Sequence, residues 1–226
     1  MNRRLPHQTQ LRGLSARVLP LFVALLVFSG CSGRTVTVEI PPKVDLSSWP
    51  VIGIVDFTAD PHEELSPEAT QKFLAHVQSA QPGTRLLELG SEENVLLALN
   101  RNTLDPEAIK AIGRKYGVAA VLAGRLEVSE ATPRIDLSPD LKSFSAKASV
   151  KGALSAKLRE TATGATVWTN GAHGQWKVAG MDLGSGGLAN VSISDPAERY
   201  DQMLGELADV ATRDFRPRYE RHQVQD

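Results

Sequence analysis

One short segment gathers most of the side-chain types that could hold a metal ion. It begins at the end of an apolar run over residues 51–57 and contains Asp56, Asp60, His62, Glu63 and Glu64. Carboxylates and an imidazole could together bind a divalent cation. A solvated loop after a strand has the same composition, because such loops are commonly charged. The five residues match no known ligand spacing, so the sequence favours the solvated loop.

The other residue types that carry chemistry have no catalytic spacing. None of the five histidines has another four residues away, the spacing of a helical metal site. Gly184-Ser-Gly-Gly187 is glycine-rich, but no Lys-Ser or Lys-Thr pair follows it, which indicates a flexible loop and not a phosphate-binding one. No serine has a histidine partner at a recognisable spacing. We therefore predict a protein that is not an enzyme and that uses no cofactor and no metal.

Composition excludes several further classes of protein. The chain has 226 residues, 42% of them apolar, and 25 basic against 26 acidic residues. Its single cysteine excludes a disulfide scaffold and a multi-cysteine zinc site. The near-neutral charge predicts no nucleic-acid partner.

The amino-terminal thirty residues have the pattern of an export signal. They hold four arginines and no acidic residue, and Val18–Phe28 is a run of eleven residues of which ten are apolar. That run is too short to span a bilayer, which needs about 20 residues, but it suits the apolar core of a signal peptide. The only cysteine, Cys31, follows directly after Ser29 and Gly30.

The sequence Phe28-Ser29-Gly30-Cys31 resembles the lipobox of bacterial lipoproteins, where Leu, Val or Ile is usual at the position of Phe28. The resemblance implies a signal peptide over residues 1–30 and acylation of Cys31, so that the lipid bilayer is a partner. The alternative is an ordinary secretory signal that leaves Cys31 free. Ser32 after the cysteine implies sorting to the outer membrane of a bacterial envelope, facing the periplasm.

We divide the mature chain into a lipidated tether over residues 31–48, one folded domain over 49–217 and a polar tail over 218–226. The four arginines leave with the signal peptide, so 21 basic residues remain against 26 acidic ones, a net charge of −5. Fully extended, the 17 residues from Ser32 to Ser48 reach about 60 Å at most, which keeps the domain near its membrane.

The first half of the domain alternates strands with helices. Strands are expected over residues 51–57, 85–89 and 118–128, because these runs are apolar and rich in β-branched residues or Leu. Between them, N-cap signals at Ser66, Ser91 and Asp105 each open a helical pattern, and Gly117 ends the last one. The pattern predicts β-α-β-α-β, with a further helix before the third strand.

The second half predicts an antiparallel hairpin and a helix. From Phe144 to Leu158 the even positions are apolar or small and the odd positions are mostly Ser and Lys, which is typical of a strand with one buried face. A turn over residues 161–165 leads into a returning strand over 166–178, interrupted at Gly171 and Gly174, and Asp195-Pro196 caps a final helix. The expected fold is α+β, a mixed β-sheet backed by helices.

Two sets of side chains on the hairpin are candidates for binding a partner. Basic residues occupy the exposed face of the long strand, and they could meet an acidic partner, anionic lipid headgroups or a cell-wall carboxylate. Lysines also deter aggregation of exposed sheets. Trp168 and Trp176 could be binding platforms or could cover the end of the core. The candidate set is Lys147, Lys151, Lys157, Trp168 and Trp176, with Arg159 continuing the basic row.

Three segments resemble a superfamily of envelope domains that includes the curli secretion lipoprotein CsgG, the amino-terminal domain of TolB and the penicillin-binding-protein activator LpoB. They are Val-Ile-Gly-Ile-Val-Asp-Phe at 51–57, Lys-Tyr-Gly-Val-Ala-Ala-Val-Leu-Ala-Gly at 115–124 and Thr-Gly-Ala-Thr-Val-Trp at 163–168. The resemblance implies a mixed sheet backed by helices, used for protein interaction and without catalytic residues.

The function expected from these features is that of a membrane-anchored, periplasm-facing lipoprotein. It would be a non-catalytic interaction or assembly module of an envelope complex, with an envelope protein as partner and a homo-oligomer as a possible state. Two alternatives stay open. One is a CsgG-like outer-membrane secretion pore subunit, since about 9–11 residues suffice for a membrane strand. The other is an LpoB-like activator of a peptidoglycan synthase.

Overall fold

The computed structural model describes residues 34–137, 144–183, 189–190 and 196–224. The predicted signal peptide, Cys31, the glycine-rich segment 184–187 and the helix cap at Asp195 lie outside these residues. Contacts divide the chain into two compact units. Pro41–Arg218 forms one, and the other contains the strands at the two ends of the described chain. The two units are described separately.

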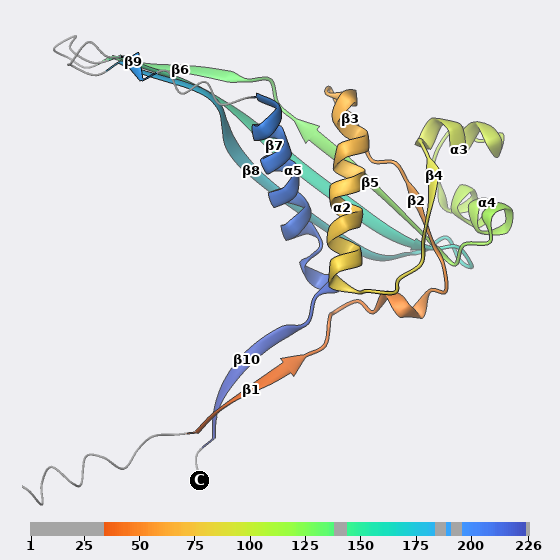
Figure 1. The fold of residues 1–226 in the computed structure, drawn as a ribbon. Coiled ribbons are helices and arrows are strands. Elements are labelled where there is room, and N and C mark those ends of the chain that lie inside the picture. Colours follow the sequence, from red (N-terminus) through yellow and green to blue (C-terminus); the bar gives the residue numbers. More distant parts are fainter. Residues whose placement is uncertain (1–33, 138–143, 184–188, 191–195, 225–226) are drawn as a thin grey trace, which may run out of the picture. The chain divides into compact units, whose positions relative to one another are not determined.

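A mixed sheet forms the framework of the unit Pro41–Arg218 (Figure 1). Its strands are β2 (Ile52–Val55), β3 (Thr58–Asp60), β4 (Leu86–Gly90), β5 (Ala120–Val128), β6 (Thr132–Leu137), β7 (Phe144–Glu160), β8 (Thr166–Leu183) and β9 (Ala189–Asn190). The main path runs β4-β2-β5-β7-β8-β9, while β3 pairs with β5 and β6 pairs with β7. Pairs among β2 to β5 are parallel, and every pair that includes β7 or β8 is antiparallel. The predicted α+β fold is confirmed.

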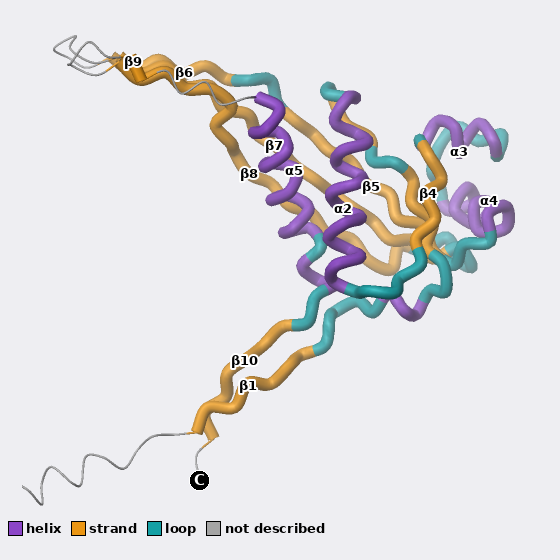
Figure 2. The backbone as a smooth tube through the Cα atoms, viewed as in Figure 1, coloured by secondary structure: helices purple, strands orange, loops and turns teal. Residues whose placement is uncertain are grey.

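Helices cover both faces of this sheet, but over different strands (Figures 1 and 2). The four are α2 (Ser66–Ala80), α3 (Glu92–Ala98), α4 (Pro106–Tyr116) and α5 (Pro196–Ala211). Helices α2 and α5 pack together with the larger core, to which β5 contributes Leu122 and Leu126. Helices α3 and α4 pack on the opposite face against Val121 of β5 and Val55 of β2. Because alternate residues of β5 enter the two cores, the sheet is buried on both sides there.

The local helix signals are confirmed at two of three positions. Ser91 accepts a hydrogen bond from the Asn94 amide (3.3 Å), and Asp105 accepts one from the Ala108 amide (2.7 Å). Gly117 ends α4 in the left-handed conformation with φ 69°, which glycine adopts without steric cost. The prediction of Ser66 as an N-cap is wrong. A 3₁₀ turn (Glu63–Leu65) precedes it, and its hydroxyl donates to the Phe57 carbonyl instead.

The hairpin β7–β8 follows the predicted alternation along its helix-covered part. Even residues from Val150 to Leu158 are buried beneath α2 and α5. The returning strand differs from the prediction, because β8 runs through both glycines without a break. Gly174 is needed there, since a Cβ at this position would lie 2.5 Å from the Trp176 ring. The glycine makes room for an indole on the same face of the strand.

The tether and the tail also differ from the sequence prediction. Arg34–Ile40 (β1) and Arg218–Val224 (β10) form a two-stranded sheet instead of extended or frayed chain. The alternation of Thr and Val over residues 35–38 favours a strand, since β-branched residues suit a pleated surface. Val36 and Val38 stay about 40% exposed (40% and 43%). Within the described ranges, no helix is long and apolar enough to cross a bilayer.

One side chain at the end of α2 joins three separate segments. The Gln81 Oε1 atom accepts from the Leu46 amide (2.8 Å), and its Nε2 donates to the carbonyls of Val44 (2.6 Å) and Phe215 (3.0 Å). These bonds hold the entry and exit of the unit against the helix end.

We expect Gln81→Ala to lower the free energy of unfolding by about 2–3 kcal/mol, because it leaves partly buried backbone groups without partners. Urea unfolding followed by circular dichroism measures the change. The control is Gln71→Ala in the same helix, whose bond to Glu88 (2.9 Å) is exposed, with an expected change below about 0.5 kcal/mol. Equal effects of the two variants would contradict the assigned role.

Candidate functional site

The outer face of β5, β7 and β8, opposite α2 and α5, carries a group of cations that we call the cationic face. Register places them together: Arg125 pairs with Ser155, Lys157 pairs with Thr169, and Lys151 pairs with Gln175. Two residues further along β8, Lys177 pairs with Ser149. All of these cations are exposed. The cationic face consists of Arg125, Lys151, Lys157 and Lys177.

No ion pair neutralises these cations in the part of the chain that the structure describes. Two acids lie among them: Glu127, which pairs in register with Ala153, and Asp60 of β3, which pairs with Glu127. A hollow of about 520 Å³ opens here, lined by Asp60, Glu127, Lys151 and residues that include His173, which also pairs with Ala153. The face therefore has a local excess of positive charge, with two carboxylates at this hollow.

The sequence-predicted lysines are only partly united by the fold. Lys151 and Lys157 lie on the cationic face, whereas Lys147 is half-buried between β6 and β8 and has an interaction of its own. Arg159 donates to the Leu104 carbonyl and thereby holds the loop before α4. Arg125 and Lys177 were missed, although both stand in predicted strands, because their alignment with β7 depends on the register between strands.

Both tryptophans lie on the other face of the sheet, beneath α5. Trp168 is buried (7% exposed), its ring centroid is 4.5 Å from that of Phe215, and its indole N–H donates to Asp214 (3.3 Å). Trp176 is half-buried and donates to Glu206 (2.7 Å). Trp168 thus covers the core, the second of its two expected roles. The tryptophans and the lysines cannot form one contact surface.

The acidic segment does not assemble into a metal site in the described part of the chain, where no group of three metal-ligating side chains is found. His62 Nδ1 contacts Glu64 Oε1 at 3.0 Å, and its ring lies 6.0 Å from that of Tyr200. Partial burial, with the nearby Glu88 charge, raises the pKa of Asp56. Asp60 and Glu63 are exposed, as the solvated-loop interpretation predicts.

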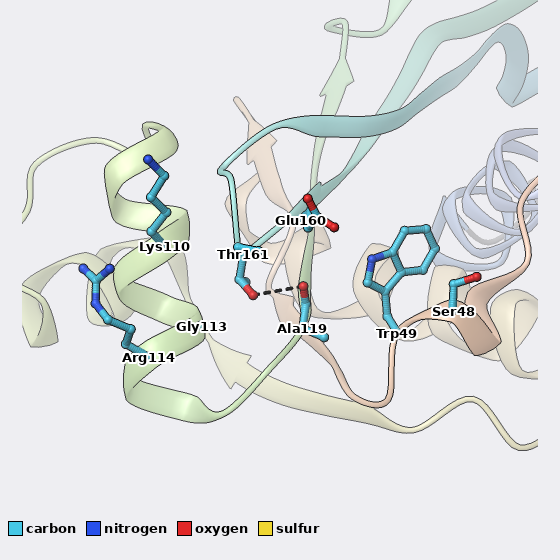
Figure 3. Close-up of a pocket in the computed structure, with 9 residues that line it drawn as sticks. Ser48, Trp49, Lys110, Gly113, Arg114, Ala119, Glu160 and Thr161 are labelled. Carbon is cyan, nitrogen blue, oxygen red and sulfur yellow. Dashed lines mark hydrogen bonds between the residues drawn. The ribbon is translucent and has the colours of Figure 1, made fainter.

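A pocket of about 540 Å³ lies between α4, the β7–β8 turn and the segment before β2 (Figure 3). Thr161 donates to the Ala119 carbonyl (2.9 Å) at its floor. Gly113 allows this approach, because a Cβ there would lie 2.4 Å from that of Thr161. Lys110 is paired with Glu107 (2.8 Å), which lowers the pKa of that carboxyl. Thr161 thus binds the turn to the segment before β5, and Lys110 is paired within α4.

The ion pair between Lys43 and Asp214 (2.8 Å) links the entry of the unit to its carboxyl end. The Lys43 ammonium, with a smaller contribution from the Trp168 indole N–H, lowers the pKa of Asp214 below its usual value of 3.8. A carboxyl with a depressed pKa stabilises the fold above its unfolded-state pKa, and this contribution is lost as the pH falls through the folded-state value.

We expect Asp214→Asn to lower the melting temperature at pH 7 and to have a shrinking effect as the pH falls below about 4. Thermal unfolding of both proteins between pH 2.5 and pH 7 measures the difference. A constant difference across this range would show that the charge of Asp214 is not what stabilises the fold.

Comparisons with known proteins give structural likenesses only. No family model matches the chain, and no curated protein matches it. The PelC dodecamer from Paraburkholderia phytofirmans is similar at 11% identity and TM-score 0.41, over 81% of this chain and 98% of that one. The LpoB carboxyl-terminal domain from Salmonella enterica is similar at 15% identity and TM-score 0.34, over 69% and 93%. A minor lipoprotein from Acinetobacter baumannii is similar at 14% identity and TM-score 0.30, over 77% and 97%. LpoB is thus among the similar structures, as the sequence predicted, and the likeness concerns the fold alone.

Proposed function

We propose that this chain is a lipid-anchored, non-catalytic interaction module of the bacterial envelope. Acylated Cys31 holds it on the membrane, with the outer membrane and its periplasmic side as the expected location. The cationic face is the surface through which it binds an acidic partner. The observation that carries the proposal is the set of four exposed cations without ion pairs on the part of the outer sheet face that α3 and α4 leave open.

Charge segregation supports a binding role for this face. The mature chain has a net charge of −5, so a random surface patch would be acidic. The cationic face instead concentrates positive charge around two carboxylates, Glu127 and Asp60. A local field of this kind attracts and orients an oppositely charged partner.

Several polar side chains are bound to backbone groups of the fold, which supports a non-catalytic role. Thr70 accepts from the Phe57 amide (2.9 Å), Thr161 donates to the Ala119 carbonyl, and Gln81 binds three backbone groups in two distant segments. These buried or half-buried groups stabilise the fold. His62, the histidine beside the acidic segment, is engaged by Glu64 and the Tyr200 ring.

The packing of β7 argues against the pore alternative for most of this strand. Val150, Leu154 and Leu158 lie in the core beneath the helices, so inserting this part of the strand in a bilayer would remove α2 and α5 from their packing. The hairpin is better suited to remain in the sheet. The synthase-activator alternative remains a prediction, and no contact among the described residues specifically favours it.

Site-specific photo-crosslinking in cells tests the proposal. A photoreactive residue at position 155, in the middle of the cationic face, is expected to capture one defined envelope component. The matched control is position 210 on α5, where Val210 is 39% exposed on the other face. Capture from 155 should be lost when Lys151 and Lys157 are changed to Glu. Equal capture from both positions, or capture of neither protein nor phospholipid from 155, would overturn the proposal.

A further inference from the structure

We propose that the acidic partner of the cationic face is the anionic phospholipid headgroup layer of the membrane that holds the anchor. The domain would then rest on the bilayer through β5, β7 and β8, with α2 and α5 directed away from it. This inference rests on the proposed function, because it names the partner of the same face.

The spacing of the cations suits an extended charged surface better than a single charged group. Lys151 and Lys157 are six residues apart on one strand, which corresponds to about 20 Å, and Arg125 stands one strand away. A compact anion could contact only one or two of them. A headgroup layer can supply one phosphate to each cation across the whole face.

The side chains between the cations also favour lipid over protein. They are small or polar and include no aromatic anchor: Ala153, Ser155, Thr169, Gly171, His173 and Gln175. Protein interfaces take most of their affinity from aromatic residues and Arg in desolvated pockets, and they are depleted in Lys. Both tryptophans of the hairpin lie on the opposite face. Lysines, by contrast, reach a fluid headgroup layer through long side chains without a matched pocket.

Because the anchor holds the domain near the membrane, a weak affinity of the cationic face for the headgroups is sufficient for contact. The domain unit begins at Pro41, so the nine residues 32–40 hold it within about 30 Å of the membrane at most. Binding of the face is then effectively intramolecular. Each cation near an anionic surface then strengthens contact by about fivefold at low salt. Glu127 opposes this attraction, and its replacement by Gln should strengthen contact by a similar factor.

A depth-sensitive fluorescence measurement on the full lipidated chain tests this inference. Acylation occupies Cys31, so Ser155→Cys creates a single free thiol on the cationic face for a fluorophore. Vesicles contain phosphatidylcholine, with or without phosphatidylglycerol, and a nitroxide on the headgroup of a tracer lipid as quencher. Val210→Cys on α5 is the matched site on the other face.

We expect strong quenching at position 155 on phosphatidylglycerol vesicles, weak quenching on phosphatidylcholine alone, and weak quenching at position 210 on both. Lys151→Glu with Lys157→Glu should reduce face contact at least about 25-fold, and high salt should act likewise. Arg213→Glu, at an exposed cation just after α5, should leave it unchanged.

Equal quenching at positions 155 and 210, or quenching independent of phosphatidylglycerol, would overturn the inference. If a protein is captured from position 155 in cells while no lipid contact is measured, the proposed function stands and the membrane assignment fails. If position 155 contacts neither lipid nor protein, both fail. The unchanged melting temperature of each variant confirms that it is folded.

Discussion

Replacing Phe57 with alanine is expected to lower the free energy of unfolding by about 3–5 kcal/mol. Phe57 is 1% exposed, and its ring centroid lies 5.0 Å from that of Phe73 of α2. It also fills the space above Gly124, where a Cβ would lie 2.6 Å from the Phe57 ring. The ring therefore occupies the junction between β5 and α2, and its removal leaves a cavity that neighbouring backbone cannot close.

The same geometry predicts a compensating substitution. Gly124→Val alone should destabilise the protein by about 1–3 kcal/mol, because its side chain collides with the Phe57 ring. When Phe57→Ala and Gly124→Val are combined, the valine enters the space that the ring vacates. This double variant should be more stable than the sum of the two single effects predicts, by about 1 kcal/mol or more.

Chemical unfolding of the wild type, the two single variants and the double variant measures this coupling. If Phe57→Ala does not fold, Phe57→Leu takes its place. Phe215→Ala with Gly124→Val is the control pair, because Phe215 packs against Trp168 at another part of the core. That pair should be additive within about 0.5 kcal/mol. Additivity of the Phe57 pair as well would show that the ring does not occupy the space above Gly124.

Cys31→Ser is expected to release the mature protein from the membrane fraction, apart from a weak association at low salt. Lipid chains contribute about 0.8 kcal/mol for each buried methylene, so stable attachment requires the acylated thiol. The variant should lose incorporation of radiolabelled palmitate and should appear in the soluble fraction after cell disruption. The amino terminus of the wild-type mature chain should be an acylated cysteine by mass spectrometry.

The cationic face provides a graded control for this result. Lys151→Glu with Lys157→Glu should leave palmitate incorporation and membrane attachment unchanged, because the anchor alone suffices. The double lysine variant on the Cys31→Ser background should abolish the weak residual association that the face can supply at low salt. Retention of Cys31→Ser at the membrane in high salt would contradict lipid anchoring at this residue.

Local signals predicted most of the helices and the long hairpin. Asp105, Pro106 and Gly117 bound α4 as expected, because capping and left-handed φ involve atoms only a few residues apart. The alternation along β7 likewise predicted which side chains are buried, since a strand turns each successive residue to the opposite face. Ser66 failed as a cap because a distant carbonyl, that of Phe57, competes for its hydroxyl.

The pairings between distant segments could not be inferred from these signals. The polar sequence of β10 and the short β1 become strands only by pairing with each other from opposite ends of the described chain. Residues 132–137 form β6 because β7 extends beyond β5 and offers them a partner. In each case the strand depends on backbone hydrogen bonds to a segment whose position is set by the rest of the fold.

The candidate site likewise combines features that the sequence predicts with features that only the fold determines. Residue types and spacing by themselves predict a lipid-anchored, aliphatic α+β protein with a basic strand, because export signals, alternation and capping are local properties of the chain. Only the tertiary structure shows that Arg125 and Lys177 lie on the same face as Lys151 and Lys157. It also shows that Trp168 is buried in the core. Which side chains share a face of a sheet depends on the register between its strands, and register is set by the packing of the whole domain.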